Sequence, residues 1–83
     1  MASKESSELA SRASLIYEQK LRSRLESAHP DDFVAIEPES GDSFLGSTLS
    51  EAIQGARTAY PDRLSFALRI GYKSTVELGV LTP

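Results

Sequence analysis

Apolar residues recur at steps of three and four in the first third of the chain, which predicts an amphipathic helix over residues 8–28. Pro30 disfavours helical geometry at His29, so we expect the helix to end there. Residues 1–7 are small and polar, and we expect them to be a flexible N-terminus. The predicted apolar stripe consists of Leu9, Ala13, Ile16, Tyr17, Leu21, Leu25 and Ala28.

The pattern then changes to that of a β-hairpin. Residues 32–37 are rich in β-branched and aromatic side chains, and residues 43–47 form a second short run of the same kind. Between them, residues 38–42 hold proline, glycine and aspartate, which are typical turn residues. The pattern predicts two antiparallel strands with a five-residue loop.

The segment Thr48-Leu49-Ser50-Glu51 follows the capping-box pattern and predicts the start of a second helix. We expect the Thr48 hydroxyl to accept from the Glu51 amide, and the Glu51 carboxylate to reach back to the Thr48 amide. Pro61 ends this helix. Its narrow apolar stripe consists of Leu49, Ala52, Ile53 and Ala56.

The last part of the chain alternates apolar and polar residues. Residues 64–70 predict a third strand with one buried face, and residues 72–80 predict a fourth. The order is therefore α-β-β-α-β-β in a single α+β domain over residues 8–83. We expect the third strand to pair beside the first, giving a small antiparallel sheet with the helices on one face.

Composition narrows the class of protein. The chain has 83 residues, a net charge of −3 and no cysteine, so it forms no disulfide. No run approaches the ~20 apolar residues of a membrane span, and the start lacks the apolar stretch of a secretory signal. We expect a cytoplasmic protein, and the net acidity argues against a nucleic-acid partner.

The charges are unevenly distributed. Residues 30–55 contain six acidic residues and no basic one, a net charge of −6 that falls mostly on the hairpin. One interpretation is an electrostatic patch for a basic partner. The other is a solvated hairpin whose charges prevent edge-to-edge aggregation.

Catalytic chemistry is poorly represented. Nucleophilic catalysis needs a positioned base, and the single histidine, His29, stands where a helix-capping cation is favoured. One histidine without cysteine does not make a zinc site. Solvated carboxylates keep ordinary pKa values and are poor acids, and the glycines do not form a phosphate loop. We therefore expect neither an enzyme nor a cofactor.

The first helix offers the strongest sign of a partner. A stripe of about 20 residues spans about 30 Å, whereas a short strand spans about 20 Å. We expect part of the stripe to overhang the sheet and to meet a protein partner or a second copy. The predicted partner-binding residues, from this stripe and the acidic hairpin, are Leu9, Ile16, Tyr17, Leu21, Leu25, Glu37, Glu39 and Asp42.

From Tyr17 to Gly79 the chain resembles a group of short bacterial proteins of unknown function, many of them cyanobacterial. The resemblance implies no catalytic residues. Such proteins are often encoded beside a small retropepsin-like aspartic protease, which implies a companion or regulator of another protein. This chain lacks the Asp-Thr/Ser-Gly triplet of that protease. The resemblance rests on Tyr17-Glu18-Gln19-Lys20-Leu21-Arg22, Phe33-Val34-Ala35-Ile36-Glu37-Pro38-Glu39-Ser40-Gly41-Asp42, Phe44-Leu45-Gly46, Glu51-Ala52, Ala56-Arg57, Tyr60-Pro61-Asp62 and Arg69-Ile70-Gly71.

Three functions remain open from the sequence. The favoured one is a small non-enzymatic protein-interaction or regulatory module. The alternative is an antitoxin-like DNA-binding autorepressor, which would use the basic side chains of the first helix: Arg12, Lys20, Arg22 and Arg24. The least favoured is a small hydrolase or metal-dependent enzyme that uses the carboxylates Asp31, Asp32, Glu37 or Glu39.

Overall fold

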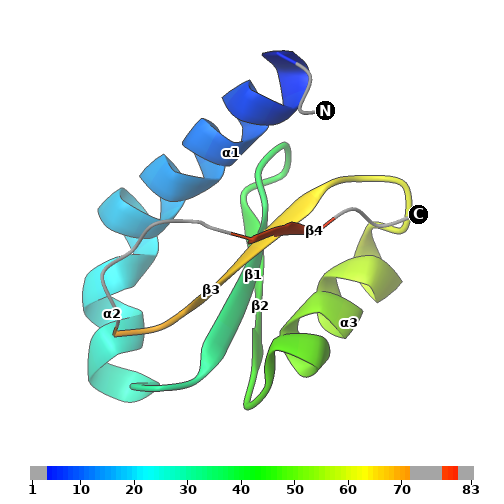
Figure 1. The fold of residues 1–83 in the computed structure, drawn as a ribbon. Helices are drawn as coiled ribbons and strands as arrows, with labels where there is room; N and C mark the ends of the chain where they lie inside the picture. The colour runs from blue at the N-terminus through cyan, green and yellow to red at the C-terminus, as the bar shows by residue number, and fades with distance from the viewer. Residues whose placement is uncertain (1–3, 72–77, 81–83) are drawn as a thin grey trace.

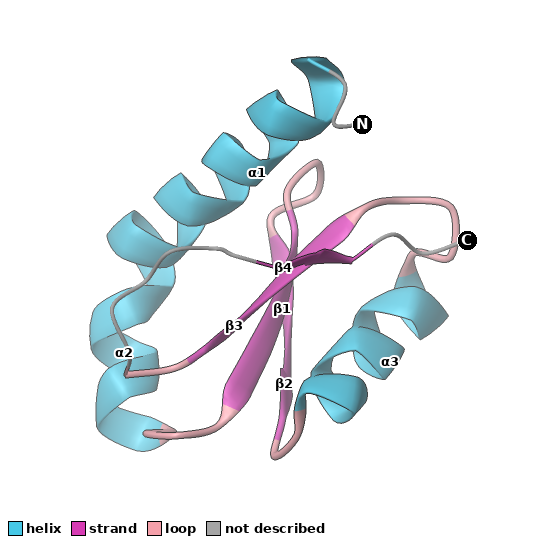
Figure 2. Ribbon diagram, in the orientation of Figure 1, coloured by secondary structure: helices cyan, strands magenta, loops and turns pink. Residues whose placement is uncertain are grey.

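The computed structural model describes residues 4–71 and 78–80, and these form two helical layers around one sheet (Figure 1). The order of helices and strands is the predicted one, and the α+β class is confirmed. The bounds, coloured by type in Figure 2, are α1 (Lys4–Ile16), the π-helix η1 (Tyr17–Leu21), α2 (Arg22–Ala28), β1 (Phe33–Glu37), β2 (Asp42–Gly46), α3 (Leu49–Ala59), β3 (Ser65–Arg69) and β4 (Leu78–Val80).

The first helix is continuous through α1, η1 and α2, and His29 caps its C-terminal end as predicted. The helix begins at Lys4, so residues 4–7, assigned above to a flexible N-terminus, are helical. Residues 1–3 lie outside the described part of the chain.

The π-helical turn keeps the apolar stripe aligned with the sheet. Ala13, Tyr17, Leu21 and Leu25 are spaced by four, and in an α-helix each such step rotates the side chain about 40° past a full turn. The wider i→i+5 turn of η1 offsets this drift between Tyr17 and Leu21. All four residues are consequently buried.

The sheet has the strand order β2-β1-β3-β4 with every pair antiparallel, so the predicted placement of the third strand beside the first is confirmed. Glu37 pairs with Asp42, which leaves a four-residue loop rather than five. Gly41 takes the positive φ of 82° that this turn requires. Of the predicted fourth strand, Leu78–Val80 is observed, and residues 72–77 lie outside the described residues.

The helices cover opposite faces of the sheet, which corrects the expectation that both pack on one face (Figure 1). Val34 and Ile36 point to the α1–α2 side, whereas Ala35 between them points to α3. Strands β1 and β3 are central and are buried on both faces. The alanines of β1 and β3 on the α3 side, Ala35 and Ala67, indicate a second helical layer, and the sequence analysis did not use them.

Helix α3 lies close to the sheet because its contact residues are small. Ala52 and Ala56 pack against alanines of β1 and β3. A Cβ at Gly46 would stand 2.5 Å from the Ala52 amide nitrogen, so only glycine fits where β2 passes the start of α3. Thr48 accepts from the Glu51 amide at 3.1 Å as predicted, but the Glu51 carboxylate bonds Ser47 rather than Thr48.

Candidate interaction surface

The apolar stripe of the first helix packs on the chain's own sheet. Tyr17, Leu21 and Leu25 belong to the core together with the bulky side chains of β1 and β3. Leu9 and Ile16 are partly buried and pack against the same cluster. The stripe is therefore not the surplus surface that the sequence suggested, and a partner has no access to its three central residues.

Glu37 is also removed from the predicted partner-binding set. Its side chain is 0% exposed, although it lies in the acidic hairpin. Its carboxylate accepts from the backbone amides of Glu39 and Ser40, both at 2.8 Å, and from the Arg63 guanidinium at 3.1 Å. These bonds fix the β1–β2 turn and connect it to the segment after α3.

The same contacts set the protonation of Glu37. Burial raises the pKa of this carboxyl group, but the bonds donated by Ser40, Glu39 and Arg63 outweigh burial and hold the pKa below its ordinary value. Glu37 therefore remains charged inside the protein. Its role in this arrangement is to tie the hairpin together rather than to take up or release a proton.

Asp42 is exposed and accepts a hydrogen bond from the Tyr60 hydroxyl. The Tyr60 ring packs edge-on against Phe44, with centroids 6.2 Å apart, and lies under the Arg63 guanidinium at 5.2 Å. Glu39 is exposed at the hairpin tip. Residues 36–42 and 60–62 thus meet here, and their contacts hold the hairpin against the end of α3.

The remaining carboxylates of the hypothetical hydrolase lie at the opposite end of β1. Asp32 pairs with the His29 imidazole at 3.4 Å, and Asp31 lies 4.0 Å from the Arg69 guanidinium. These contacts hold the turn between α2 and β1. No group of three acidic or histidine side chains suited to a metal ion occurs among the residues that the structure describes.

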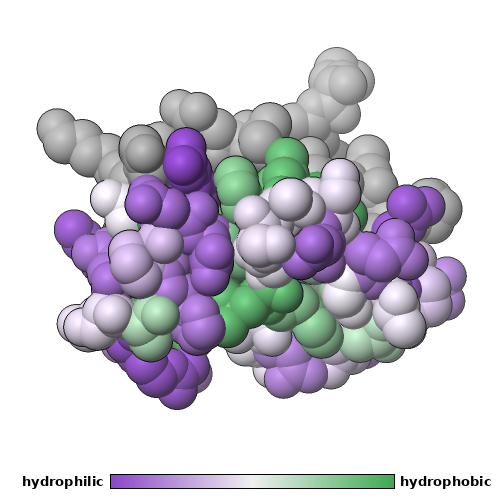
Figure 3. Space-filling view, turned by 90° about the horizontal axis from the view of Figure 1, so that it is seen from below, coloured by the Kyte–Doolittle hydropathy of each residue, from purple (hydrophilic) through white to green (hydrophobic). Residues whose placement is uncertain are grey.

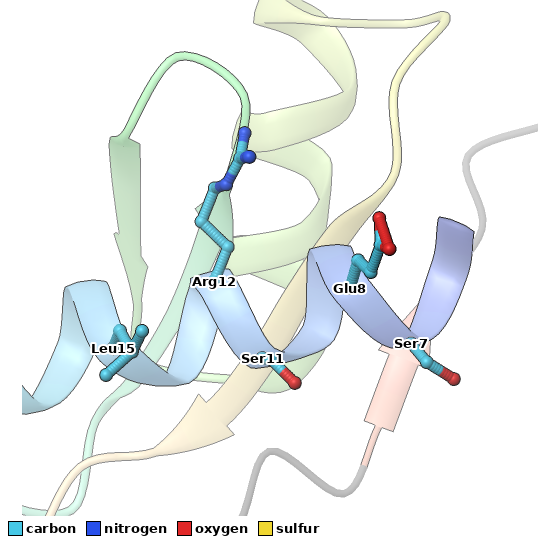
Figure 4. A pocket seen from close by; sticks show the side chains of 5 residues that line it. All are labelled: Ser7, Glu8, Ser11, Arg12 and Leu15. Atoms are coloured by element: carbon cyan, nitrogen blue, oxygen red, sulfur yellow. The ribbon is translucent and has the colours of Figure 1, made fainter. Parts of the chain in front are cut away.

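Among the residues that the structure describes, two large apolar side chains are exposed, and neither belongs to the predicted partner-binding set. Leu15 is 55% exposed and Leu45 is 43% exposed. Leu15 lies on the outer side of α1, beside a shallow, open hollow that this helix alone lines in the described chain (Figure 4). The exposure of Leu15 could have been predicted, because its position on the helix lies opposite the apolar stripe. Leu45 carries no such sign, because its run looks like any buried strand.

Leu45 is exposed because α1–α2 does not cover the edge strand β2. It pairs with Val34, whose side chain is fully buried on the α1–α2 side of the sheet. Ile16 packs partly buried against the same core. We define the β2 surface as the exposed edge of β2 with the side chains of Ser43 and Leu45. Seen from below, apolar residues gather between the hydrophilic α1–α2 layer and the α3 layer (Figure 3).

The two flanks of the first helix differ in charge. On one flank Arg22 bonds Glu18 at 2.8 Å and Glu26 at 3.2 Å, so its charge is matched. On the other, the row of residues spaced by four that contains Ile16 carries three exposed basic side chains. They have no ion pair within the described chain, and they are Arg12, Lys20 and Arg24.

Comparison with protein families, with curated proteins and with solved structures finds no match for this chain. In the described residues, no helix has the length and apolar character needed to cross a membrane.

Proposed function

We propose that this chain is a small non-enzymatic protein-interaction module, with a regulatory role, that binds the main chain of a partner at the β2 surface. The observation that carries the proposal is the exposure of Leu45 on an edge strand, while the other apolar side of β2, at Phe44, is covered by α3.

An edge strand offers backbone N–H and C=O groups on its outer side, and an extended segment of another protein pairs with them by adding a strand. Main-chain hydrogen bonds supply affinity, and a side chain such as Leu45 supplies a contact for alternate residues of the partner. In the order β2-β1-β3-β4, β2 has one neighbour within the described sheet.

The residues once considered for catalysis support a structural assignment instead. Glu37 is enclosed and accepts hydrogen bonds on both carboxylate oxygens, and the His29 imidazole contacts the Asp32 carboxylate. A catalytic carboxylate must reach substrate, and a side chain that is 0% exposed does not.

The two exposed leucines provide a matched test. Tagged wild-type, Leu45→Lys and Leu15→Lys proteins are used to capture partners from native lysate with and without nuclease. The main partner is then purified and its dissociation constant is measured by calorimetry. We expect Leu45→Lys to weaken binding at least about tenfold, because burial of a leucine contributes about 1.5–3 kcal/mol, whereas Leu15→Lys binds like the wild type.

Equal binding by the wild type and Leu45→Lys would contradict the proposal. Capture that disappears with nuclease, and that depends on the basic side chains of the first helix, would favour the DNA-binding autorepressor.

A further inference from the structure

We infer that the β2 surface takes an extended acidic peptide, which adds a strand to β2 and places carboxylates against the basic row formed by Arg12, Lys20 and Arg24. This inference rests on the proposed function, because it specifies the chemistry of the partner that binds there.

The basic row lies on the β2 side of the first helix. The opposite flank carries Glu26, whose carboxylate accepts a hydrogen bond from the Tyr17 hydroxyl at 3.4 Å, and the backbone of Gly71, directly after β3, lies near the same hydroxyl. Since β3 lies away from β2 in the strand order, the flank with the basic row faces the other way, over β2. Figure 4 shows Arg12 pointing to the side of the β1–β2 hairpin.

Charge complementarity selects an occupant whose acidic side chains face the basic row. On the α3 side of the added strand, Asp42 and Glu51 would repel acidic side chains. A strand added to β2 on its free side would run below the helix flank that carries the three basic side chains. Exposed ion pairs are individually weak, and three of them together strengthen binding by about tenfold. Alternate side chains of the added strand would face this helix, and apolar ones among them would cover Leu45.

A second copy of this chain is a poorer occupant. When two β2 strands pair antiparallel over their full length, Asp42 of each stands opposite Gly46 of the other. A Cβ built on Gly46 lies 2.7 Å from the Glu51 Cβ, so Glu51 covers that position. Self-pairing would therefore bring Asp42 and Glu51 together on the α3 side, and like charges opposite one another destabilise a strand pair.

Nucleic acid fits the basic row but not the strand edge. Phosphate oxygens accept hydrogen bonds and donate none, so they leave the outward carbonyl groups of β2 without partners. The net charge of −3 also opposes a polyanion that extends beyond the three basic side chains. A peptide supplies both donors and acceptors.

The test selects binders from a displayed library of random ten-residue peptides, using wild-type protein and the triple variant Arg12→Glu, Lys20→Glu, Arg24→Glu. We expect the wild type to enrich both acidic and apolar residues at the alternate positions that face the helix, and the triple variant to enrich Lys and Arg at those positions. The best wild-type peptide should bind the triple variant at least about tenfold more weakly.

Two controls separate position from net charge. Lys20→Glu should weaken the selected peptide, whereas Arg57→Glu, an equal charge change on exposed α3, should not. Amide hydrogen exchange at Ser43 and Leu45 should slow when the peptide is bound, as expected for an added strand. Circular dichroism checks that each variant keeps its fold.

Each other outcome overturns the inference. These outcomes are selected peptides without acidic enrichment, enrichment that the triple variant leaves unchanged, a Leu45-dependent dimer by light scattering, or duplex DNA displacing the peptide. If acidic selection fails while the lysate partner still depends on Leu45, the inference falls and the proposed function stands. If the partner does not depend on Leu45, the proposed function itself fails.

Discussion

The two faces of the sheet are packed by side chains of very different size. Toward α1–α2 the sheet presents valine, isoleucine, leucine and phenylalanine, and Tyr17, Leu21 and Leu25 of the helix pack against them. Toward α3 the contact is built largely from alanines, with aromatic residues at its margin. Packing of large buried side chains stabilises the face toward α1–α2. Close approach of the helix backbone to the sheet backbone stabilises the face toward α3.

The difference teaches why β2 is covered on one side only. Helix α3 contacts β2 closely, because Gly55 lets Phe44 approach to a distance where an added Cβ would stand 3.2 Å from the Phe44 Cβ. The first helix instead packs on the bulky residues of β1 and β3. Leu45 is therefore left exposed on the side of β2 that faces away from α3.

The largest effect should follow loss of volume on the bulky face. Phe66→Ala removes a ring that is 5% exposed, and we expect the free energy of unfolding to fall by about 3–5 kcal/mol. Urea denaturation measures this change, with Leu15→Ala as the exposed control. A loss below about 1 kcal/mol would mean that this face does not depend on volume.

The close face should respond to the opposite change. Ala56→Leu adds volume at a position that is 1% exposed between helix and sheet, and we expect a loss of about 1–3 kcal/mol. Gln54→Leu, at an exposed position of the same helix, serves as the control. If Ala56→Leu stabilised the protein, α3 would not be held by close approach.

A polar contact on the α3 side gives a third, pH-dependent test. Replacing Glu37 by Gln places an amide N–H donor against one of the partly buried backbone N–H donors of the turn, at a cost of about 1–3 kcal/mol. The folded-state pKa of Glu37 is lowered, so the unfolded chain binds the proton more tightly. The contribution of the charged Glu37 to the free energy of unfolding should be fully present at neutral pH. It should be lost as the pH falls below the ordinary glutamate pKa.

Denaturation curves at several pH values between neutral and strongly acidic measure this dependence. Glu37→Gln should flatten the acid limb relative to the wild type. An identical acid limb in both proteins would show that other carboxylates govern acid unfolding.

The smallest change in stability should come from the uncovered side of β2. Leu45→Lys alters a side chain that is 43% exposed, and we expect its free energy of unfolding to stay within about 0.5 kcal/mol of the wild type. Thermal denaturation provides the measurement. A large loss would show that Leu45 is part of the core, and it would remove the reason to assign it to binding.

Much of the fold follows from local patterns. The proline after His29 and the capping residue Thr48 correctly marked helix ends, because these residues act through backbone geometry and nearby amides. The hairpin position was predicted, but its loop length was not, because the pairing of Glu37 with Asp42 depends on side-chain bonds. Of the predicted partner residues, Glu39 and Asp42 are exposed, and Leu9 and Ile16 are partly buried.

The burial of Glu37 could not be predicted from its acidic surroundings. Its charge is compensated by Arg63, which is 26 positions away in the chain. Likewise, strand alternation identified inward residues, but not how many faces of each strand are covered.

The sequence by itself determined the helices, the strands, their order and the class of the domain, since propensity, capping and periodicity act within a few residues. Only the tertiary structure decided which layer lies on which face, which carboxylate is buried and which leucine is left exposed. Those outcomes depend on the sizes and charges of side chains that are distant in the sequence and in contact in the fold. A local sequence pattern does not show which of these side chains come into contact.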